Sequence, residues 1–311
     1  MADDPQQNIL VIKLGAMGDI VMALGPFAAI RHHHPGAKIT LLTTSVFRAF
    51  LEPSGYFDEI WTDSRPSLLQ VSDWLNLKSR LRRGCFTRVY DMQTSDRSGW
   101  YFRLFGSHRR PEWSGIARGC SHPHANPHRD FMHSIERQDE QLAMAGIPST
   151  PSADLSWVTA DIARFGLEER YVLLVPGGAP HRLAKRWPAE RYAKLACTLT
   201  RQGMQPVILG SSAEAPLAQE IRSGCSSAKD LSGQTDIADI AVLAREAAGA
   251  VGNDTGPIHM TAAAGCSTVV LFSAASDPSL TAPRGTEIEI LRCDNLADLS
   301  VESVAAALSL R

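Results

Sequence analysis

The sequence has no closely spaced cysteine pairs. Its 6 cysteines are scattered along the chain, and none belongs to a Cys-x-x-Cys motif. The scattered cysteines therefore match no Cys-x-x-Cys zinc or redox motif. Unpaired cysteines are typical of a reducing compartment, which favours the cytoplasm.

Long apolar runs are also missing. No stretch approaches the roughly 20 apolar residues that a membrane-spanning helix needs. Residues 1–8 are polar and acidic, without the basic and then apolar order of a secretion signal. We therefore expect a cytoplasmic protein.

The chain carries little net charge, -2 at pH 7, so its overall charge does not indicate nucleic-acid binding. The exception is residues 78–118, which hold ten basic residues and only three acidic ones. This basic cluster is either a contact surface for anions or the solvated face of a helix, and the pattern leaves both open. Its members are Lys78, Arg80, Arg82, Arg83, Arg88, Arg97, Arg103, Arg109, Arg110 and Arg118.

The dinucleotide-binding fingerprint Gly-x-Gly-x-x-Gly is incomplete. The first predicted strand runs into a turn that has glycine only at Gly15 and Gly18, which argues against an NAD-dependent enzyme. The same turn contains Asp19, at the start of a predicted helix. An aspartate there is either a helix cap or a group that faces a ligand.

Short apolar runs that alternate with helical patterns predict an α/β fold with parallel sheets. In the first half the expected strands cover residues 8–13, 38–42, 59–62 and 88–92. In the second half they cover residues 171–175, 206–209, 250–252 and 268–272. With 311 residues, the chain is long enough for two domains.

The domain boundary is expected near residue 150. Residues 129–146 are predicted to form a helix that ends at Gly146, and residues 148–152, rich in proline and serine, follow as a linker. We therefore expect one Rossmann-like domain over residues 1–150 and another over residues 151–311. Two such halves facing each other would form a cleft at the carboxyl ends of their strands, where ligands of parallel sheets bind.

A glycine-containing loop in the second half predicts a diphosphate site. Gly177 and Gly178 follow a strand, and Lys185 and Arg186 come shortly after them. Glycine lets the backbone approach an anion closely, and the two basic residues supply positive charge. A surface loop with basic residues would show the same pattern, so both interpretations remain open.

Residues 252–259, Gly-Asn-Asp-Thr-Gly-Pro-Ile-His, lead from a strand into a short predicted helix. The free amides and the positive dipole end of that helix suit a phosphate, and His259 can point toward the same anion. Turn and cap chemistry would also favour these residue types. Ser211 and Glu214 open another helix, where a carboxylate can bind ribose hydroxyls or simply complement the helix dipole.

A group of cysteine and histidine residues between positions 120 and 133 does not predict a metal site. Its spacing matches no zinc pattern, and Pro123 and Pro127 interrupt it. We therefore expect no metal. The group comprises Cys120, His122, His124, His128 and His133.

Taken together, these motifs resemble the heptosyltransferases of lipopolysaccharide assembly, glycosyltransferase family 9, over most of the chain. The anchors are residues 13–19 (Lys-Leu-Gly-Ala-Met-Gly-Asp), 185–188 (Lys-Arg-Trp-Pro) and 252–259, together with Asp91-x-Gln93 and Arg97-Ser98. The resemblance implies the GT-B architecture, in which two Rossmann-like domains with parallel sheets face an interdomain cleft. It also implies an inverting, metal-independent transfer of a heptose or similar sugar from an ADP-sugar to the lipopolysaccharide core.

The resemblance implies a role for each matching residue. Asp19 would be the general base, and Gln93 and Arg97 would lie on the acceptor side. Lys185 would hold the diphosphate, and Glu214 would bind the ribose. The expected nucleotide-sugar and diphosphate-binding residues are Gly15, Gly18, Gly177, Gly178, Lys185, Ser211, Glu214, Asp254, Thr255, Gly256 and His259.

The implied partners are an ADP-sugar donor and a phosphorylated acceptor of the lipopolysaccharide type, with no nucleic acid and no further cofactor. The basic cluster would suit such an acceptor and an anionic leaflet, which extends the expected location to peripheral contact with the inner face of the inner membrane. Two alternatives stay open: a nucleotide-sugar epimerase of the same architecture, and a non-catalytic protein that binds ADP-sugars.

Overall fold

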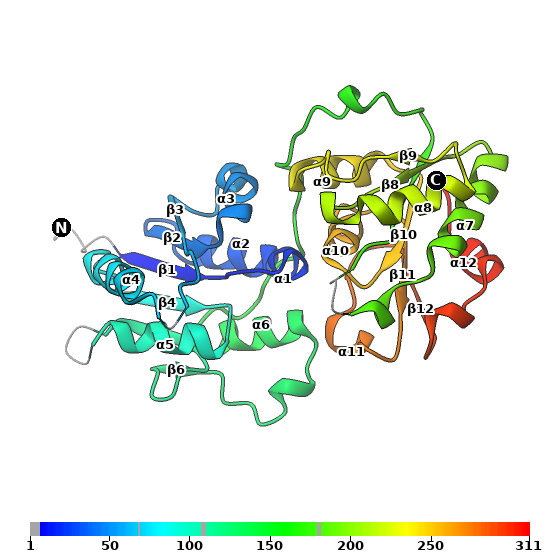
Figure 1. Cartoon of the computed structure of the whole chain (residues 1–311). Coiled ribbons are helices and arrows are strands. Elements are labelled where there is room, and N and C mark those ends of the chain that lie inside the picture. The colour runs from blue at the N-terminus through cyan, green and yellow to red at the C-terminus, as the bar shows by residue number, and fades with distance from the viewer. Residues whose placement is uncertain (1–6, 68, 107–109, 179–181) are drawn as a thin grey trace. The chain divides into compact units, whose positions relative to one another are not determined.

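The computed structural model describes residues 7–67, 69–106, 110–178 and 182–311. Arg109 of the basic cluster lies outside these ranges. The chain divides into two compact units, Met1–Ala153 (unit 1) and Asp154–Arg311 (unit 2), which are the blue-to-green and green-to-red parts of Figure 1. Each unit has its own sheet and its own apolar core.

Unit 1 is built on a parallel sheet whose strand order, in the described part of the chain, is β3-β2-β1-β4-β5-β6. Its strands are β1 (Asn8–Ile12), β2 (Lys38–Thr43), β3 (Glu59–Thr62), β4 (Arg88–Asp91), β5 (Glu112–Gly115) and β6 (His122–Pro123). Its α-helices are α1 (Met17–Met22), α2 (Leu24–His33), α3 (Ser45–Leu51), α4 (Val71–Arg83), α5 (Asp96–Leu104) and α6 (Ser134–Met144).

Unit 2 has a parallel sheet of order β12-β11-β10-β7-β8-β9, again counted over the residues described. Its strands are β7 (Tyr171–Val175), β8 (Gln205–Ile208), β9 (Lys229–Asp230), β10 (Gly249–Asn253), β11 (Thr268–Phe272) and β12 (Ile288–Arg292). Its α-helices are α7 (Ala189–Arg201), α8 (Ala215–Gly224), α9 (Ile237–Glu246), α10 (Gly256–Ala263), α11 (Pro278–Thr281) and α12 (Val301–Ala307).

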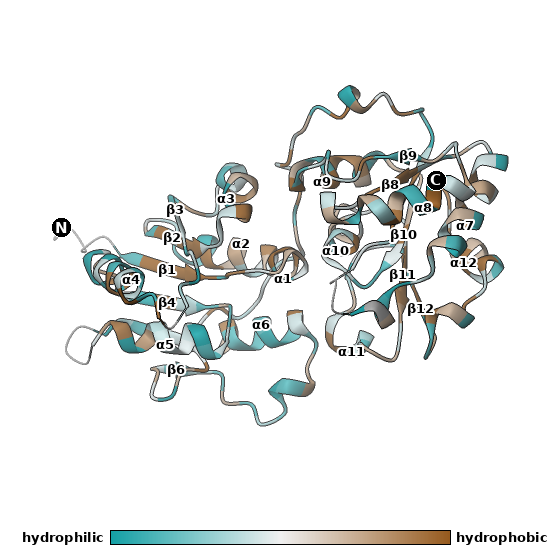
Figure 2. Ribbon diagram, in the orientation of Figure 1, coloured by the Kyte–Doolittle hydropathy of each residue, from teal (hydrophilic) through white to brown (hydrophobic). Residues whose placement is uncertain are grey.

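The central strands are continuous apolar runs because helices cover both faces of each sheet. Residues 9–12 of β1 are fully buried, as are residues 172–174 of β7. Figure 2 shows β1 in brown along its length, whereas the surface helices carry teal, hydrophilic residues. In unit 1 the core is completed by aromatic side chains such as Trp113 and Tyr101.

Both sheets have the same topology, since each places its first and fourth strands side by side at the centre. In unit 1 Ile12 of β1 pairs with Asp91 of β4, and in unit 2 Val175 of β7 pairs with Gly252 of β10. The chain reverses its direction of strand addition at these positions, and ligands of doubly wound sheets bind there, at the carboxyl ends of the strands. The two α/β units with parallel sheets that the sequence predicts are confirmed.

The helix predicted over residues 129–146 is wrong at its start. Residues Arg129–Phe131 form a short 3-10 turn, Met132 is extended, and α6 begins only at Ser134. The ring of His133 caps α6 by accepting a hydrogen bond from the amide of Ile135 at 3.2 Å. The residues before His133 are instead held by side-chain contacts with other parts of unit 1, described below.

Candidate functional site

The loop after β1 places Asp19 in the first turn of α1. Oδ2 of Asp19 accepts a hydrogen bond from the amide of Ala16 at 3.0 Å. Ala16 is the N-cap residue of α1, so Asp19 stabilises the helix start from the third helical position and is not itself the N-cap. The loop needs glycine at Gly15, where φ is +109° and a Cβ atom would lie 2.5 Å from the ring of Phe47. Asp19 is half-buried, which leaves its carboxylate partly open to solvent.

Two buried charged residues, to which the sequence assigned no role of their own, lie beside this loop. Nζ of Lys13 donates to the carbonyl of Met92 at 3.0 Å, and burial lowers the pKa of Lys13 against the opposing effect of Asp19 and Asp91. Asp91, at the end of β4, is fully buried, and burial raises its pKa to about 6. A buried lysine and a buried carboxyl group therefore lie beside the loop that carries Asp19.

The two residues predicted on the acceptor side make structural contacts. Oε1 of Gln93 accepts a hydrogen bond from the amide of Leu14 at 2.8 Å, which ties the loop after β4 to the loop after β1. The guanidinium of Arg97 donates to the carbonyl of Pro66 at 3.3 Å and lies 5.7 Å from the ring centroid of Trp74. Their roles toward an acceptor stay predictions.

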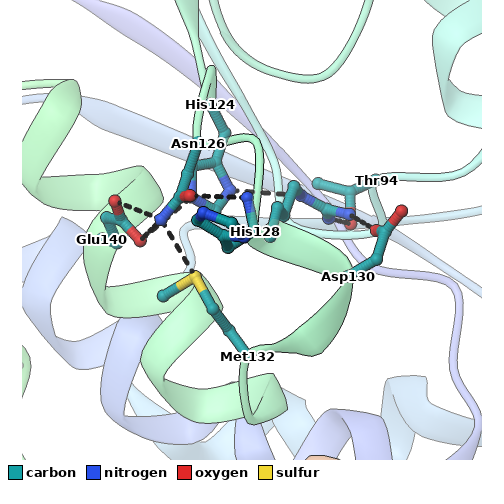
Figure 3. Close-up of polar contacts among 8 residues, drawn as sticks. Thr94, His124, Asn126, His128, Asp130, Met132 and Glu140 are labelled. Atoms are coloured by element: carbon teal, nitrogen blue, oxygen red, sulfur yellow. Dashed lines mark hydrogen bonds and ion pairs between the residues drawn. The ribbon is translucent and has the colours of Figure 1, made fainter.

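The histidine-rich segment of unit 1 forms a polar network around His124 (Figure 3). Nδ1 of His124 faces Nε of Arg129 at 3.1 Å, which requires Nδ1 to be the acceptor. Nε2 therefore carries the proton and faces Oε2 of Glu140 at 3.5 Å. Burial, assisted by Arg129, lowers the pKa of His124 despite that carboxylate. The histidine is neutral and fixes the position of Arg129.

Arg129 extends this network to the loop after β4, because its Nη2 donates to the hydroxyl of Thr94 at 2.6 Å. The charges of Arg129 and Arg137 also act on buried Lys13. The segment thus concentrates positive charge next to the turn that carries Asp19. Among the described residues, no three His, Cys, Asp or Glu side chains gather as a metal site would require.

In unit 2, Asn253 joins the loops that follow β7 and β10. Its amide nitrogen donates to the carbonyls of Pro176 at 2.7 Å and Gly177 at 3.1 Å. Its Oδ1 accepts from the amide of Trp187 at 3.0 Å and the hydroxyl of Tyr192 at 3.1 Å. This fully buried side chain therefore holds the glycine loop and the Lys185-Arg186-Trp187 segment in one arrangement.

Glu214 supports the same glycine loop. Its Oε1 accepts a hydrogen bond from the amide of Gly178 at 2.9 Å, and its Oε2 accepts from the amide of Ser211 at 2.8 Å. A Cβ atom at position 177 would lie 1.8 Å from Oε1 of Glu214, so a larger residue there would displace this carboxylate. Glu214 is thus partly engaged in structure, and its contact with a ribose remains a prediction.

Lys185, Asp254 and His259 form a charged triad in unit 2. Nζ of Lys185 lies 2.7 Å from Oδ2 of Asp254, and Nε2 of His259 lies 3.7 Å from Oδ1. Burial disfavours the charged form of Asp254, but the hydrogen bonds from His259 and Lys185 outweigh it and lower the pKa of this carboxyl. Nδ1 of His259 is buried and has no hydrogen-bond partner among the described residues.

The triad lies at the start of α10, for which Thr255 is the N-cap residue and Gly256 the first residue. The first amides of a helix have no carbonyl partner within the helix, and the helix dipole is positive there. The side chain of Arg186 donates to the carbonyl of Gly178, and Gly178 also lies near the methyl group of Thr255. Unit 2 therefore gathers glycine amides, a lysine and a helix N-terminus at the carboxyl ends of β7 and β10.

The structure brings the predicted residues together in two groups, one in each unit. In unit 2 these are Gly177, Gly178, Lys185, Ser211, Glu214, Asp254, Thr255, Gly256 and His259. In unit 1 they are Gly15, Gly18, Asp19 and Gln93, with Arg97 on the next helix.

A family model matches most of the chain. The model of glycosyltransferase family 9 (heptosyltransferase) matches residues 74–306, well over half of the chain. The chain belongs to glycosyltransferase family 9. It is therefore a glycosyltransferase, and the family that the motifs suggested is confirmed.

Curated members of family 9 are similar along most of the chain. The sequence is 25% identical over 306 residues to lipopolysaccharide heptosyltransferase 2 of Escherichia coli (strain K12), covering 92% of this chain and 88% of that one. It is 24% identical over 307 residues to the protein of the same name from Salmonella typhimurium, with the same coverage.

Solved structures of family 9 members show the same fold. The E. coli ADP-heptose lipopolysaccharide heptosyltransferase II has a TM-score of 0.79 at 22% identity, with 97% of both chains covered. A family 9 glycosyltransferase from Veillonella parvula has a TM-score of 0.84 at 18% identity, covering 97% of this chain and 95% of that one. These matches confirm the GT-B fold class. Among the residues that the structure describes, no helix is long and apolar enough to cross a membrane.

Proposed function

We propose that this glycosyltransferase moves a heptose from ADP-heptose to the core of lipopolysaccharide, with inversion at the anomeric carbon. The observation that carries the proposal is the group formed by Lys185, Asp254, His259 and the start of α10 in a family 9 chain. The names of the similar curated proteins, lipopolysaccharide heptosyltransferase 2, support the choice of sugar and acceptor.

The donor diphosphate would be held in unit 2 without a metal ion. One proton of the Lys185 ammonium group is directed at Asp254, which leaves two for the oxygens of a diphosphate. The free amides at the start of α10 would add further hydrogen bonds. Since Nε2 of His259 faces Asp254, its Nδ1 would donate to a phosphate oxygen only in the doubly protonated imidazolium. Together they would stabilise the negative charge that develops on the leaving ADP.

The proposed reaction is a single displacement. The acceptor hydroxyl loses its proton to the carboxylate of Asp19, and its oxygen forms a bond to the anomeric carbon. The bond from that carbon to the diphosphate oxygen breaks, and ADP leaves with the bonding electrons. Glu214 and Ser211 would contact the ribose, and Gly177 and Gly178 would allow close approach of the diphosphate.

On the acceptor side, we propose that unit 1 meets a phosphorylated lipopolysaccharide precursor at the inner face of the inner membrane. Gln93 and Arg97 would lie near the acceptor, as the family resemblance implies. Arg129, fixed by His124 and Thr94, adds positive charge beside the loop that carries Asp19. Positive charge of this kind suits a phosphorylated sugar.

One experiment distinguishes the proposed transferase from an epimerase and from a non-catalytic protein that binds ADP-sugars. Epimerases share the fold, as the UDP-GlcNAc 2-epimerase from Methanocaldococcus jannaschii shows with a TM-score of 0.60 at 12% identity. The protein is incubated with ADP-heptose alone and with heptose-deficient lipopolysaccharide, and ADP, the donor and the acceptor are followed by mass spectrometry. We expect ADP release and sugar addition only when both substrates are present. Conversion of the donor alone would favour an epimerase, and binding without turnover would favour a non-catalytic protein.

A further inference from the structure

The outer side of α4 and α5 in unit 1 exposes large apolar side chains. Leu69, in the turn before α4, is 91% exposed, Val71 and Leu75 on α4 are 62% and 58% exposed, and Trp100 on α5 is 56% exposed. Exposed apolar residues are usually scattered singly, so a group of them on neighbouring elements indicates a contact surface. We define the α4–α5 patch as Leu69, Val71, Leu75, Lys78, Arg82 and Trp100.

Helical spacing aligns the α4 members of the patch. Val71, Leu75, Lys78 and Arg82 recur at intervals of four, three and four residues, so they share one side of α4. This side borders α5, because Nε of Arg82 donates to the carbonyl of Leu104 at 2.8 Å. The apolar residues therefore occupy the first part of the stripe and the basic residues the last part.

Trp100 continues the patch onto α5. The two helices meet through the rings of Trp74 and Tyr101, whose centroids are 5.9 Å apart. Arg97, one turn before Trp100, reaches across to the ring of Trp74 at 5.7 Å. Trp100 immediately precedes Tyr101 in α5 and is exposed, and the guanidinium of Arg103 stacks on its ring at 4.6 Å.

The positive charge of α4 and α5 indicates what kind of partner the α4–α5 patch would bind. α4 and α5 together carry six basic residues against Asp73 and Asp96. A symmetric contact with a second copy of this chain would bring basic residues against basic residues, which is unfavourable. The headgroup region of an anionic bilayer accepts both kinds of side chain, since apolar groups and a tryptophan enter it while basic groups meet phosphates.

We propose that the α4–α5 patch binds the headgroup region of an anionic lipid bilayer and thereby holds unit 1 against the membrane. The inference rests on the proposed function in one respect, namely that the acceptor is carried by a membrane lipid. The patch would allow the enzyme to meet this acceptor at the surface instead of by encounter in solution.

The test is co-sedimentation of the full-length protein with vesicles. Vesicles of phosphatidylcholine that also contain phosphatidylglycerol are compared with vesicles of phosphatidylcholine alone, at low and high salt. The wild-type protein should partition onto the anionic vesicles, less at high salt. Leu75→Glu and Trp100→Glu should each lower the partition coefficient about tenfold, and Lys78→Glu about fivefold.

Val46→Glu is the matched control, because Val46 is 63% exposed on α3, outside the patch, and should bind vesicles as the wild type does. Thermal unfolding and ADP binding verify that each variant is folded. The proposal is overturned if the wild type does not prefer anionic vesicles, or if Val46→Glu loses as much binding as Leu75→Glu. It is also overturned if sedimentation velocity shows a wild-type dimer that Leu75→Glu converts to a monomer.

Failure of the membrane proposal can be distinguished from failure of the proposed function. Transfer of heptose to a delipidated acceptor fragment should proceed equally well in the wild type, Leu75→Glu and Trp100→Glu. If the wild type binds anionic vesicles but transfers no sugar to that fragment, the proposed function fails and the membrane inference stands.

Discussion

Asp19 is the residue whose chemistry differs most between the structural and the catalytic interpretations. Its Oδ2 caps the amide of Ala16, a contact that an asparagine oxygen can also make. Asn cannot accept a proton as a base, however, so Asp19→Asn separates the two roles. We expect the variant to unfold at the same temperature as the wild type and to transfer heptose about a thousandfold more slowly.

A folded Asp19→Asn protein with wild-type turnover would remove Asp19 from the catalytic role. The matched control is Asp96→Asn, in the first turn of α5, which should keep full activity with a delipidated acceptor. Steady-state rates of ADP release and thermal unfolding of both variants provide the measurement.

Lys185 is the predicted contact of the donor diphosphate. Lys185→Ala should weaken ADP binding about tenfold and AMP binding much less, because AMP lacks the β-phosphate. Calorimetry with both nucleotides gives the comparison, and Lys194→Ala, at an exposed lysine on α7, should leave both affinities unchanged. Equal losses for ADP and AMP would place Lys185 away from the diphosphate.

His34 makes the stability of unit 1 depend on pH. Its Nε2 lies 2.8 Å from the hydroxyl of Tyr90, and burial, assisted by His33 and Arg88, lowers the pKa of His34 to about 4 from 6.5. The unfolded chain therefore binds a proton more readily than the folded chain between these two values. The contribution of His34 to stability is present above pH 6.5 and is lost as pH falls toward 4.

The corresponding prediction concerns the variant His34→Gln, which keeps a hydrogen-bonding side chain but does not titrate. Between pH 7 and pH 5 the free energy of unfolding of the wild type should fall by about 1 kcal/mol more than that of the variant, once solvent screening of the half-exposed ring is allowed for. Urea unfolding at both pH values measures the difference. Parallel pH dependence of the two proteins would contradict the assignment.

At the scale of elements, the end of β10 organises the proposed donor site in unit 2. Asn253→Asp retains the acceptor for Trp187 and Tyr192 but replaces the two donors to Pro176 and Gly177 with a carboxylate. The glycine loop should then move. The KM for ADP-heptose should rise about tenfold, and kcat should fall by a smaller factor. Tyr192→Phe removes only one hydrogen bond to Asn253 and should leave the KM unchanged while lowering stability by about 1 kcal/mol.

An unchanged KM in Asn253→Asp, or an equal change in Tyr192→Phe, would mean that Asn253 serves stability alone. The two variants should differ because, of Asn253 and Tyr192, it is the Asn253 side chain that donates to the carbonyls of Pro176 and Gly177.

The strands that the sequence predicted agree with the structure to within one residue at each end. Apart from β3, a partly buried edge strand, they are inner strands whose apolar runs stand out because both faces are covered. The strands that were missed, β5, β6, β9 and β12, have short, polar or exposed segments, such as His122–Pro123 and Ile288–Arg292. Pairing with a neighbour, and not local composition, makes these segments strands.

The positions of the site residues could be predicted in part, because loops after central strands converge at the carboxyl edge of a parallel sheet. The contacts that organise the site could not. Asn253 stood within a recognised motif, but its four hydrogen bonds join segments far apart in sequence. The helix predicted over residues 129–146 failed because Arg129 is bound instead by His124 and Thr94, a tertiary contact that local propensity does not contain.

At the scale of the whole molecule, the two units repeat one topology with different chemistry. Unit 1 carries a carboxylate, buried charges and a basic outer surface at and around its loops. Unit 2 carries glycine amides, a lysine and a helix N-terminus. This division matches a transfer reaction, in which one group activates the acceptor and another stabilises the leaving diphosphate.

The central claim is that unit 2 binds the diphosphate of the donor through its own side chains and amides. A crystal structure of the full chain with ADP, grown with a chelator of divalent metals, tests it most directly. We predict diphosphate oxygens within hydrogen-bond distance of Nζ of Lys185 and of the amides of Thr255 and Gly256. ADP bound elsewhere in unit 2, or no ADP at saturating concentration, would contradict the account.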